Sequence, residues 1–216
     1  MQKKKRSNLL FTYILCLFFM FLMTGCISGS TLRTARVLEQ GQIEFSGGMS
    51  VSSFAGVAQV VIGAYGIADR IEVEGRWEEQ FFTIASRLQI LKSEANYIDG
   101  LVFFEGGYNK TVDCFQWGPG VMFGKRWSYI EPYISYRYRR LTSTPKLKAF
   151  LLDFSLPKDF HYVKLGSRIY FSKRPNNFEN HAKDLKHRFF LDLEVGPTFF
   201  GSDCIFDWAV NFGCQY

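Results

Sequence analysis

The chain has 216 residues with a formal net charge of +6, and aromatic residues make up 18% of it. Four of the positive charges are Lys3, Lys4, Lys5 and Arg6 at the N-terminus, so the remainder carries only +2. So small a charge excludes the strongly basic surface of a nucleic-acid-binding protein, and the length suits a single domain.

Residues 1–25 have the organisation of a targeting segment. The basic residues at positions 3–6 precede an apolar run over residues 9–23, which is shorter than the roughly 20 residues of a membrane-spanning helix. This pattern predicts a cleaved signal peptide, with an uncleaved membrane anchor as the alternative.

The segment ends in Leu22-Met23-Thr24-Gly25-Cys26, which resembles the lipobox of bacterial lipoproteins. In that family the cysteine is acylated and becomes the mature N-terminus. The resemblance implies a diacylglycerol on Cys26, a place in the bacterial cell envelope, and handling by the lipoprotein-sorting machinery. The small residues Ser28, Gly29 and Ser30 then predict that residues 26–41 form a lipidated N-terminal tether.

From residue 42 to the C-terminus, apolar and polar residues alternate. In residues 206–216 the apolar row is Phe206, Trp208, Val210, Phe212, Cys214 and Tyr216, and the intervening residues are polar or small. A period of two is typical of a β-strand with one apolar face. Similar stretches, some of them faint, cover residues 42–52, 57–65, 71–77, 82–90, 98–108, 115–124, 131–139, 147–155, 163–171 and 189–199.

Short turn signals separate these stretches, and no long helical period follows Cys26. Strands of about ten residues joined by hairpins predict an all-β fold over residues 42–216, an antiparallel up-and-down β-barrel of about 10–12 strands. Eleven stretches alternate, whereas single-chain bacterial barrels have an even number of strands. Either residues 147–155 are not a strand, or residues 31–38 contain a further one.

The polar rows carry charges of both signs, which would face water around a soluble barrel or pair across the lumen of a membrane barrel. Strand length and aromatic content favour the membrane barrel. Trp77, Trp127, Tyr129, Tyr133 and Trp208 lie near predicted strand ends, where aromatic girdles occur. The residues expected to form a charge network in the lumen are Glu72, Glu74, Arg76, Arg87, Glu131, Arg137, Arg139, Arg168, Asp192 and Glu194.

The C-terminal strand, with its alternating apolar row and aromatic last residue, resembles the assembly signal of outer-membrane β-barrel proteins. That signal usually ends in phenylalanine, and here the last residue is Tyr216. The resemblance implies recognition by the barrel-assembly machinery.

Few residues suggest catalysis or metal binding. His161 follows Asp159 and His187 follows Asp184, as a lipid-modifying hydrolase would need, but such neighbours in polar loops usually mark a solvated surface. His161, His181 and His187 also lack cysteine pairs at metal-ligand spacing. No catalytic residue, metal or cofactor is therefore expected.

The chain has five cysteines, of which Cys16 lies in the predicted signal peptide and Cys26 is the lipid site that the resemblance implies. The remaining three, Cys114, Cys204 and Cys214, allow at most one disulfide. Cys204 and Cys214 are ten residues apart in an extended segment, too far to bond each other, so any disulfide would involve Cys114.

These features predict a bacterial outer-membrane β-barrel lipoprotein, anchored through Cys26, with a structural, binding or narrow-channel role and no enzymatic activity. A barrel with charged inner rows should be filled by side chains and closed to large solutes. The expected partners are outer-membrane lipid and the barrel-assembly and lipoprotein-sorting machineries, not nucleic acid. Two alternatives stay open: a soluble, lipid-tethered periplasmic β-barrel that binds an apolar ligand, and an outer-membrane lipid-modifying hydrolase.

Overall fold

A computed structural model describes residues 30–52, 56–78, 81–92, 98–109, 113–142, 146–149, 152–155, 158–171 and 188–216. Over these residues the regular secondary structure consists of β-strands. No described segment is a helix long and apolar enough to cross a membrane.

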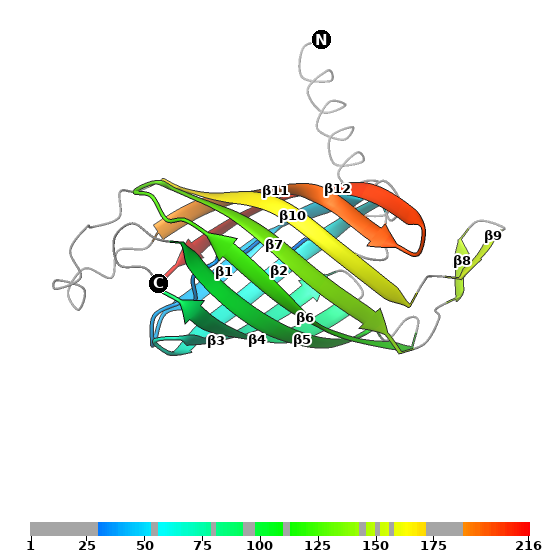
Figure 1. Cartoon of the computed structure of the whole chain (residues 1–216), viewed down its shortest axis with the longest axis horizontal. Helices are drawn as coiled ribbons and strands as arrows, with labels where there is room; N and C mark the ends of the chain where they lie inside the picture. The colour runs from blue at the N-terminus through cyan, green and yellow to red at the C-terminus, as the bar shows by residue number, and fades with distance from the viewer. Residues whose placement is uncertain are drawn as a thin grey trace, which may run out of the picture.

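Ten antiparallel strands close into a barrel (Figure 1). Each strand pairs with the barrel strands before and after it in the chain, and the ring closes where β1 pairs with the last strand, β12. This is the antiparallel up-and-down barrel that the sequence predicts. Its strands are β1 (Ile43–Ser52), β2 (Gly56–Ala68), β3 (Ile71–Glu78), β4 (Phe81–Leu91), β5 (Asp99–Asn109), β6 (Cys114–Gly124), β7 (Ile130–Leu141), β10 (Asp159–Tyr170), β11 (Arg188–Phe200) and β12 (Asp203–Gln215).

The structure resolves the strand number in favour of ten. Residues 147–155 do not add a barrel strand, because β8 (Lys146–Ala149) and β9 (Leu152–Ser155) pair only with each other in the connection between β7 and β10. Residues 31–38 are not a strand either. The alternation in residues 147–155 therefore belongs to a small hairpin that folds back on itself.

The barrel has two distinct ends. At one end, called the termini end, β1 begins and β12 finishes, and Ile43 and Tyr216 exchange two backbone hydrogen bonds of 3.1 and 2.8 Å. The turn at Asp69 and the connection between β10 and β11 lie at this end as well. The opposite end, called the far end, carries the turn at Ser202 and the connection between β7 and β10.

The wall of the barrel is apolar outside and charged inside. Phe206 and Leu165, on the outer row, are 64% and 59% exposed, whereas the neighbouring inner residues Asp207 and Lys164 are 3% and 1% exposed. The same alternation runs through β4 and β7. Since successive side chains of a strand point to opposite faces, the period of two in the sequence becomes an inside and an outside.

Four of the five expected girdle aromatics, Trp77, Trp127, Tyr129 and Trp208, are exposed. The expectation for Tyr133 is wrong, because this residue is only 4% exposed and lies inside the barrel. Tyr133 belongs to the odd-numbered row of β7, whose side chains point into the barrel. Its ring therefore points inward although it lies near the end of the strand.

Candidate functional site

The lumen holds the chain's own residues 30–41, called the luminal segment here. The sequence predicts residues 26–41 as a tether, but in the described part of that range residues 30–35, 37 and 38 are buried inside the barrel. The segment lacks a period of two and makes no strand pairing. It is buried because its apolar and basic side chains match the inner wall, as described below.

The luminal segment joins the wall through a glycine turn at the termini end. Gly41 has a positive φ of 83°, which glycine adopts without strain, and its amide donates to the carbonyl of Gly66 over 2.8 Å. A Cβ atom added at Gly66 would lie 2.0 Å from the carbonyl oxygen of Glu39. Gly66 thus allows the segment to pass close to the backbone of β2.

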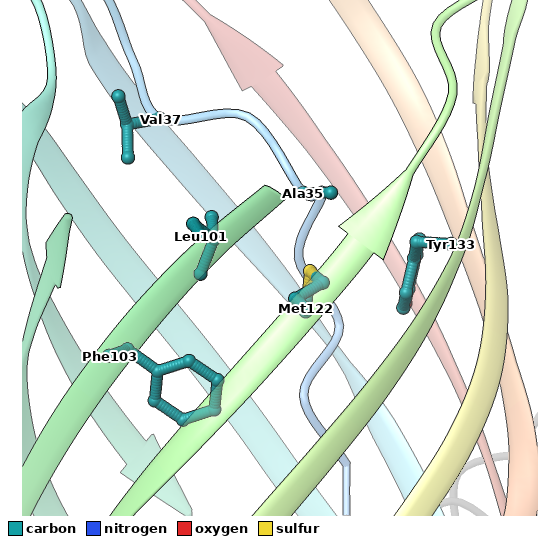
Figure 2. Close-up of a cluster of buried hydrophobic side chains, with 6 residues drawn as sticks. All are labelled: Ala35, Val37, Leu101, Phe103, Met122 and Tyr133. Carbon is teal, nitrogen blue, oxygen red and sulfur yellow. The ribbon is translucent and has the colours of Figure 1, made fainter. Parts of the chain in front are cut away.

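Apolar side chains of the segment pack against two sides of the wall. Ala35 and Val37 form a buried cluster with Leu101, Phe103, Met122 and Tyr133, and Figure 2 shows the segment passing over these residues of β5, β6 and β7. On the other side, Leu32 packs with Val60, Ile62 and Ala209 of β2 and β12.

Glu194 on β11 holds the inner end of the segment. Its carboxylate accepts hydrogen bonds from the backbone amides of Thr31, over 2.7 Å, and Leu32, over 2.9 Å. The hydroxyl of Thr31 and the hydroxyl of Tyr133, the latter over 3.0 Å, donate to the same carboxylate. Leu32 has a positive φ of 40°, a conformation that is unfavourable for leucine and is held here by these hydrogen bonds and by packing.

Arg33 is the charged centre of the segment. Its guanidinium forms ion pairs with Glu44 on β1 and with Glu72 and Glu74 on β3, and its side chain is 3% exposed. The wall also binds the segment's backbone: Arg87 donates to the carbonyl of Thr34 over 2.6 Å, and Glu72 accepts the amide of Leu38 over 2.7 Å. Arg76 donates to the carbonyls of Ser30 and Thr31.

Further ion pairs connect the wall across the lumen. Arg168 on β10 lies 2.7 Å from both Glu44 and Asp192, and its guanidinium stacks over the ring of Phe190 at 3.6 Å. Arg137 and Arg139 share Glu105, at 3.3 and 3.1 Å. Lys164 and Asp207 lie 2.9 Å apart.

All ten residues predicted for the charge network lie inside, each at most 5% exposed. Most of them belong to one network: Glu72, Glu74, Arg76 and Arg87 surround Arg33, and Glu44, which pairs with both Arg33 and Arg168, links this group to Asp192. Through Glu78 and Glu105 the network also reaches Arg139 and Arg137. Glu131 pairs with Arg126, over 2.7 Å, at the termini end. The residues not predicted are Arg33, Glu44, Glu78, Asp99, Glu105, Lys164 and Asp207, of which Glu44, Lys164 and Asp207 already lie in the polar rows of the sequence.

At the termini end, the mouth of the lumen carries two neighbouring guanidinium groups. Burial lowers the pKa of Arg36 below its ordinary value, and the positive charge of Arg126 lowers it further. The carboxylate of Glu39 lies 4.0 Å from Arg36.

In the described part of the chain, two small cavities lie beside the segment. One cavity of about 10 Å³ lies between Thr31, Arg33 and Met122, and another of about 10 Å³ lies between Arg36, Leu38 and Tyr170. Each has room for about one water molecule. A larger apolar depression of about 470 Å³ lies on the outer wall, lined by Leu88, Phe104, Pro119, Val121 and Tyr136 among others.

The residues considered for catalysis do not form a triad in the described part of the chain. His161 lies on the outer wall, where its Nδ1 is 2.8 Å from the hydroxyl of Tyr136, while Asp159 accepts a hydrogen bond from Tyr138. His181, Asp184 and His187 lie outside the described residues. Among the described residues, no group of three or more histidine, cysteine or acidic side chains has the arrangement of a metal site.

The three cysteines of the barrel are not joined by disulfides. Cys114 lies inside the barrel, in a buried cluster with Leu141, Phe160, Tyr162 and Phe200. Cys204 is exposed and Cys214 is partly exposed. The pairing that the sequence allowed, between Cys114 and one of the other two, is therefore absent.

The geometry defines a class of molecule, a closed antiparallel barrel with a charged interior filled by its own N-terminal segment. No protein-family model matches the chain, and no curated protein matches it. Similar solved structures include the N-terminal β-barrel domain of Pseudomonas aeruginosa OprF, with 10% identity and a TM-score of 0.39 over 83% of this chain and 100% of that one.

Two further structures are the Ail protein of Yersinia pestis and Neisserial surface protein A. Ail has 12% identity and a TM-score of 0.25, and covers 82% of this chain and 99% of its own. Neisserial surface protein A has 13% identity and a TM-score of 0.26, and covers 81% and 93%. The first of these is a β-barrel domain, and the likeness to all three is limited to general architecture.

Proposed function

We propose that the chain is a bacterial outer-membrane β-barrel lipoprotein with a structural or binding role and a closed, narrow lumen. The observation that carries this proposal is the distribution of side chains in the wall, with large apolar residues outside and charged residues inside. A bilayer suits such a wall, because hydrocarbon solvates the outer face and closure leaves no unpaired strand edge.

The outer face is a continuous apolar surface, which disfavours the soluble alternative. Phe212 contacts Phe189 and Phe171, with ring centroids 6.0 and 6.1 Å apart. Soluble monomers rarely expose contiguous apolar patches larger than a few hundred Å². The barrel strands have 8–13 residues, close to the about 9–11 residues of a tilted transmembrane strand.

Extraction of a variant that cannot carry the lipid anchor tests the membrane location. We expect the mature Cys26→Ala protein, exported with a non-lipoprotein signal peptide, to stay with the membrane fraction and to need detergent for release. Its gel mobility should shift on heating, as expected for a folded barrel. Release of a folded monomer into detergent-free buffer would instead support the soluble, tethered barrel that binds an apolar ligand.

The proposed lipid anchor depends on Cys26, which precedes the first described residue, Ser30, by four positions. Metabolic labelling with palmitate tests the anchor separately. The label should be lost in Cys26→Ala and kept in the matched control Cys204→Ser.

We further propose that the termini end faces the periplasm and the far end faces the exterior. Asp69 and Ser202 lie in exposed turns at these two ends. In a variant with Cys204 and Cys214 replaced by serine, a membrane-impermeant maleimide should label Ser202→Cys in intact cells. It should label Asp69→Cys only after the outer membrane is permeabilised, and the reverse pattern would overturn this orientation.

A further inference from the structure

We propose that the luminal segment is a removable plug, and that its withdrawal turns the barrel into a cation-selective channel. Of the proposed function, this inference needs only that the barrel spans a membrane. It proposes that the lumen conducts ions when the luminal segment is withdrawn, and that the seated segment keeps the lumen closed.

The segment can leave without disturbing the wall. Each barrel strand, including β1 and β12 at the seam, is paired on both sides by other strands. Apart from the amide of Gly41, which donates to the carbonyl of Gly66, residues 30–41 are held by ion pairs, apolar packing and hydrogen bonds to wall side chains such as Glu194 and Arg87. A glycine turn at Gly41 links it to β1. The backbone of the barrel therefore persists whether or not the segment is seated.

The lumen provides a path along one side of the wall. The inner faces of β1, β2 and β12 carry several small buried side chains, Ser46, Ser50, Ser52, Ala58, Ala64 and Ala209, with the larger Glu44, Val60, Ile62, Asp207 and Asn211 between them. Bulky side chains fill the side formed by β7 and β10, among them Arg137, Arg139, Phe160 and Tyr162. The luminal segment packs against the small side through Leu32. Its removal should therefore empty a passage that the bulky side chains do not already fill.

The emptied passage would be acidic. Among the described residues, the strands bury ten carboxylates and six basic side chains in the interior. The segment supplies Arg33, which pairs with three of those carboxylates, and its backbone amides bind Glu194. Without it, Glu44, Glu72, Glu74 and Glu194 lose these partners. Acidic side chains lining a pore favour cations over anions.

Planar lipid bilayers test this inference directly. The full-length protein should insert with little or no steady current, whereas a variant lacking residues 30–38 should give a steady conductance. In a potassium chloride gradient, the reversal potential of the deletion variant should shift toward the potassium equilibrium potential. The matched control is Arg140→Ala, at an exposed position of the rim, which should remain as closed as the full chain.

A reversible cross-link tests the same inference in a protein that keeps every residue of the segment. Glu194→Gln loosens the inner end of the plug and should raise the current. A Cβ added at Gly124 would lie 2.9 Å from the Cβ of Ala35, so a disulfide between Ala35→Cys and Gly124→Cys requires a shift of about 1 Å. With Cys204 and Cys214 replaced by serine, oxidation should close this loosened channel and reduction should reopen it.

The outcomes separate this inference from the proposed function. A deletion variant that inserts and is heat-modifiable but carries no current would overturn the plug. An anion-selective current would overturn the acidic passage, and a conductance unaffected by the cross-link would show that ions take another route. A protein that leaves the membrane when Cys26 is replaced would overturn the membrane barrel itself.

Discussion

Replacement of Arg168 by methionine is expected to destabilise the barrel by about 3–5 kcal/mol, the range for breaking a buried ion pair. Arg168 lies 2.7 Å from Glu44 and from Asp192, and its side chain is 2% exposed. Methionine fills much of the same volume but leaves two buried carboxylates without this partner. Urea unfolding of the protein refolded in lipid vesicles, followed by tryptophan fluorescence, measures the change in free energy.

Arg140→Met is the matched control for this substitution. Arg140 is 51% exposed in its side chain and lies 3.9 Å from Asp159, so its loss should change stability by less than about 0.5 kcal/mol. Adding Glu44→Gln and Asp192→Asn to the Arg168 variant should recover part of the loss, because the uncompensated charges are then absent. Equal effects at Arg168 and Arg140 would contradict the buried network.

Replacement of Leu165 by arginine is expected to destabilise the barrel by about 2–4 kcal/mol, the penalty for arginine at the bilayer midplane. Leu165 lies near the middle of β10 and is 59% exposed on the outer wall. Ile71→Arg should have a smaller effect, about 0–1 kcal/mol, because Ile71 is the first residue of β3 and lies close to the interface. The same vesicle unfolding assay measures both changes.

The difference between these two positions discriminates between the two surroundings of the barrel. In a soluble barrel both residues would face water, and an outward arginine would change stability by less than about 0.5 kcal/mol at either one. A depth-dependent penalty therefore indicates hydrocarbon around the wall. Equal and small effects would contradict the membrane barrel, although the charged lumen would be unchanged.

The wall of the barrel is predictable from the sequence because the side of the sheet on which a residue lies depends on local alternation alone. Glu72, Arg137 and Asp192 could be assigned to the interior for that reason. Alternation does not identify partners, however. Arg168 and Glu44 are 124 residues apart in the chain and meet only because the barrel closes. Tyr133 lies near a strand end, where an aromatic girdle is expected, but its place in the alternation turns its ring inward.

The luminal segment could not be predicted, because nothing within it specifies its environment. Residues 31–38 contain leucines, a valine and two arginines without a period of two, and such a stretch suits a tether as well as a plug. Its burial depends on carboxylates from β1 and β3 converging on Arg33. It also depends on Gly66, which makes room for the backbone at Glu39. Both conditions exist only in the assembled barrel.

The dense packing of the interior has a consequence for the effect of dissolved salt. Mobile ions weaken an exposed pair such as Arg140 and Asp159 over a Debye length of about 8 Å at physiological ionic strength. They have little access to the ion pairs of Arg33 and Arg168, because the side chains of these pairs are at most 4% exposed. The buried ion pairs should therefore keep nearly the same strength at low and at high salt, and the stability of the barrel should change little with salt concentration.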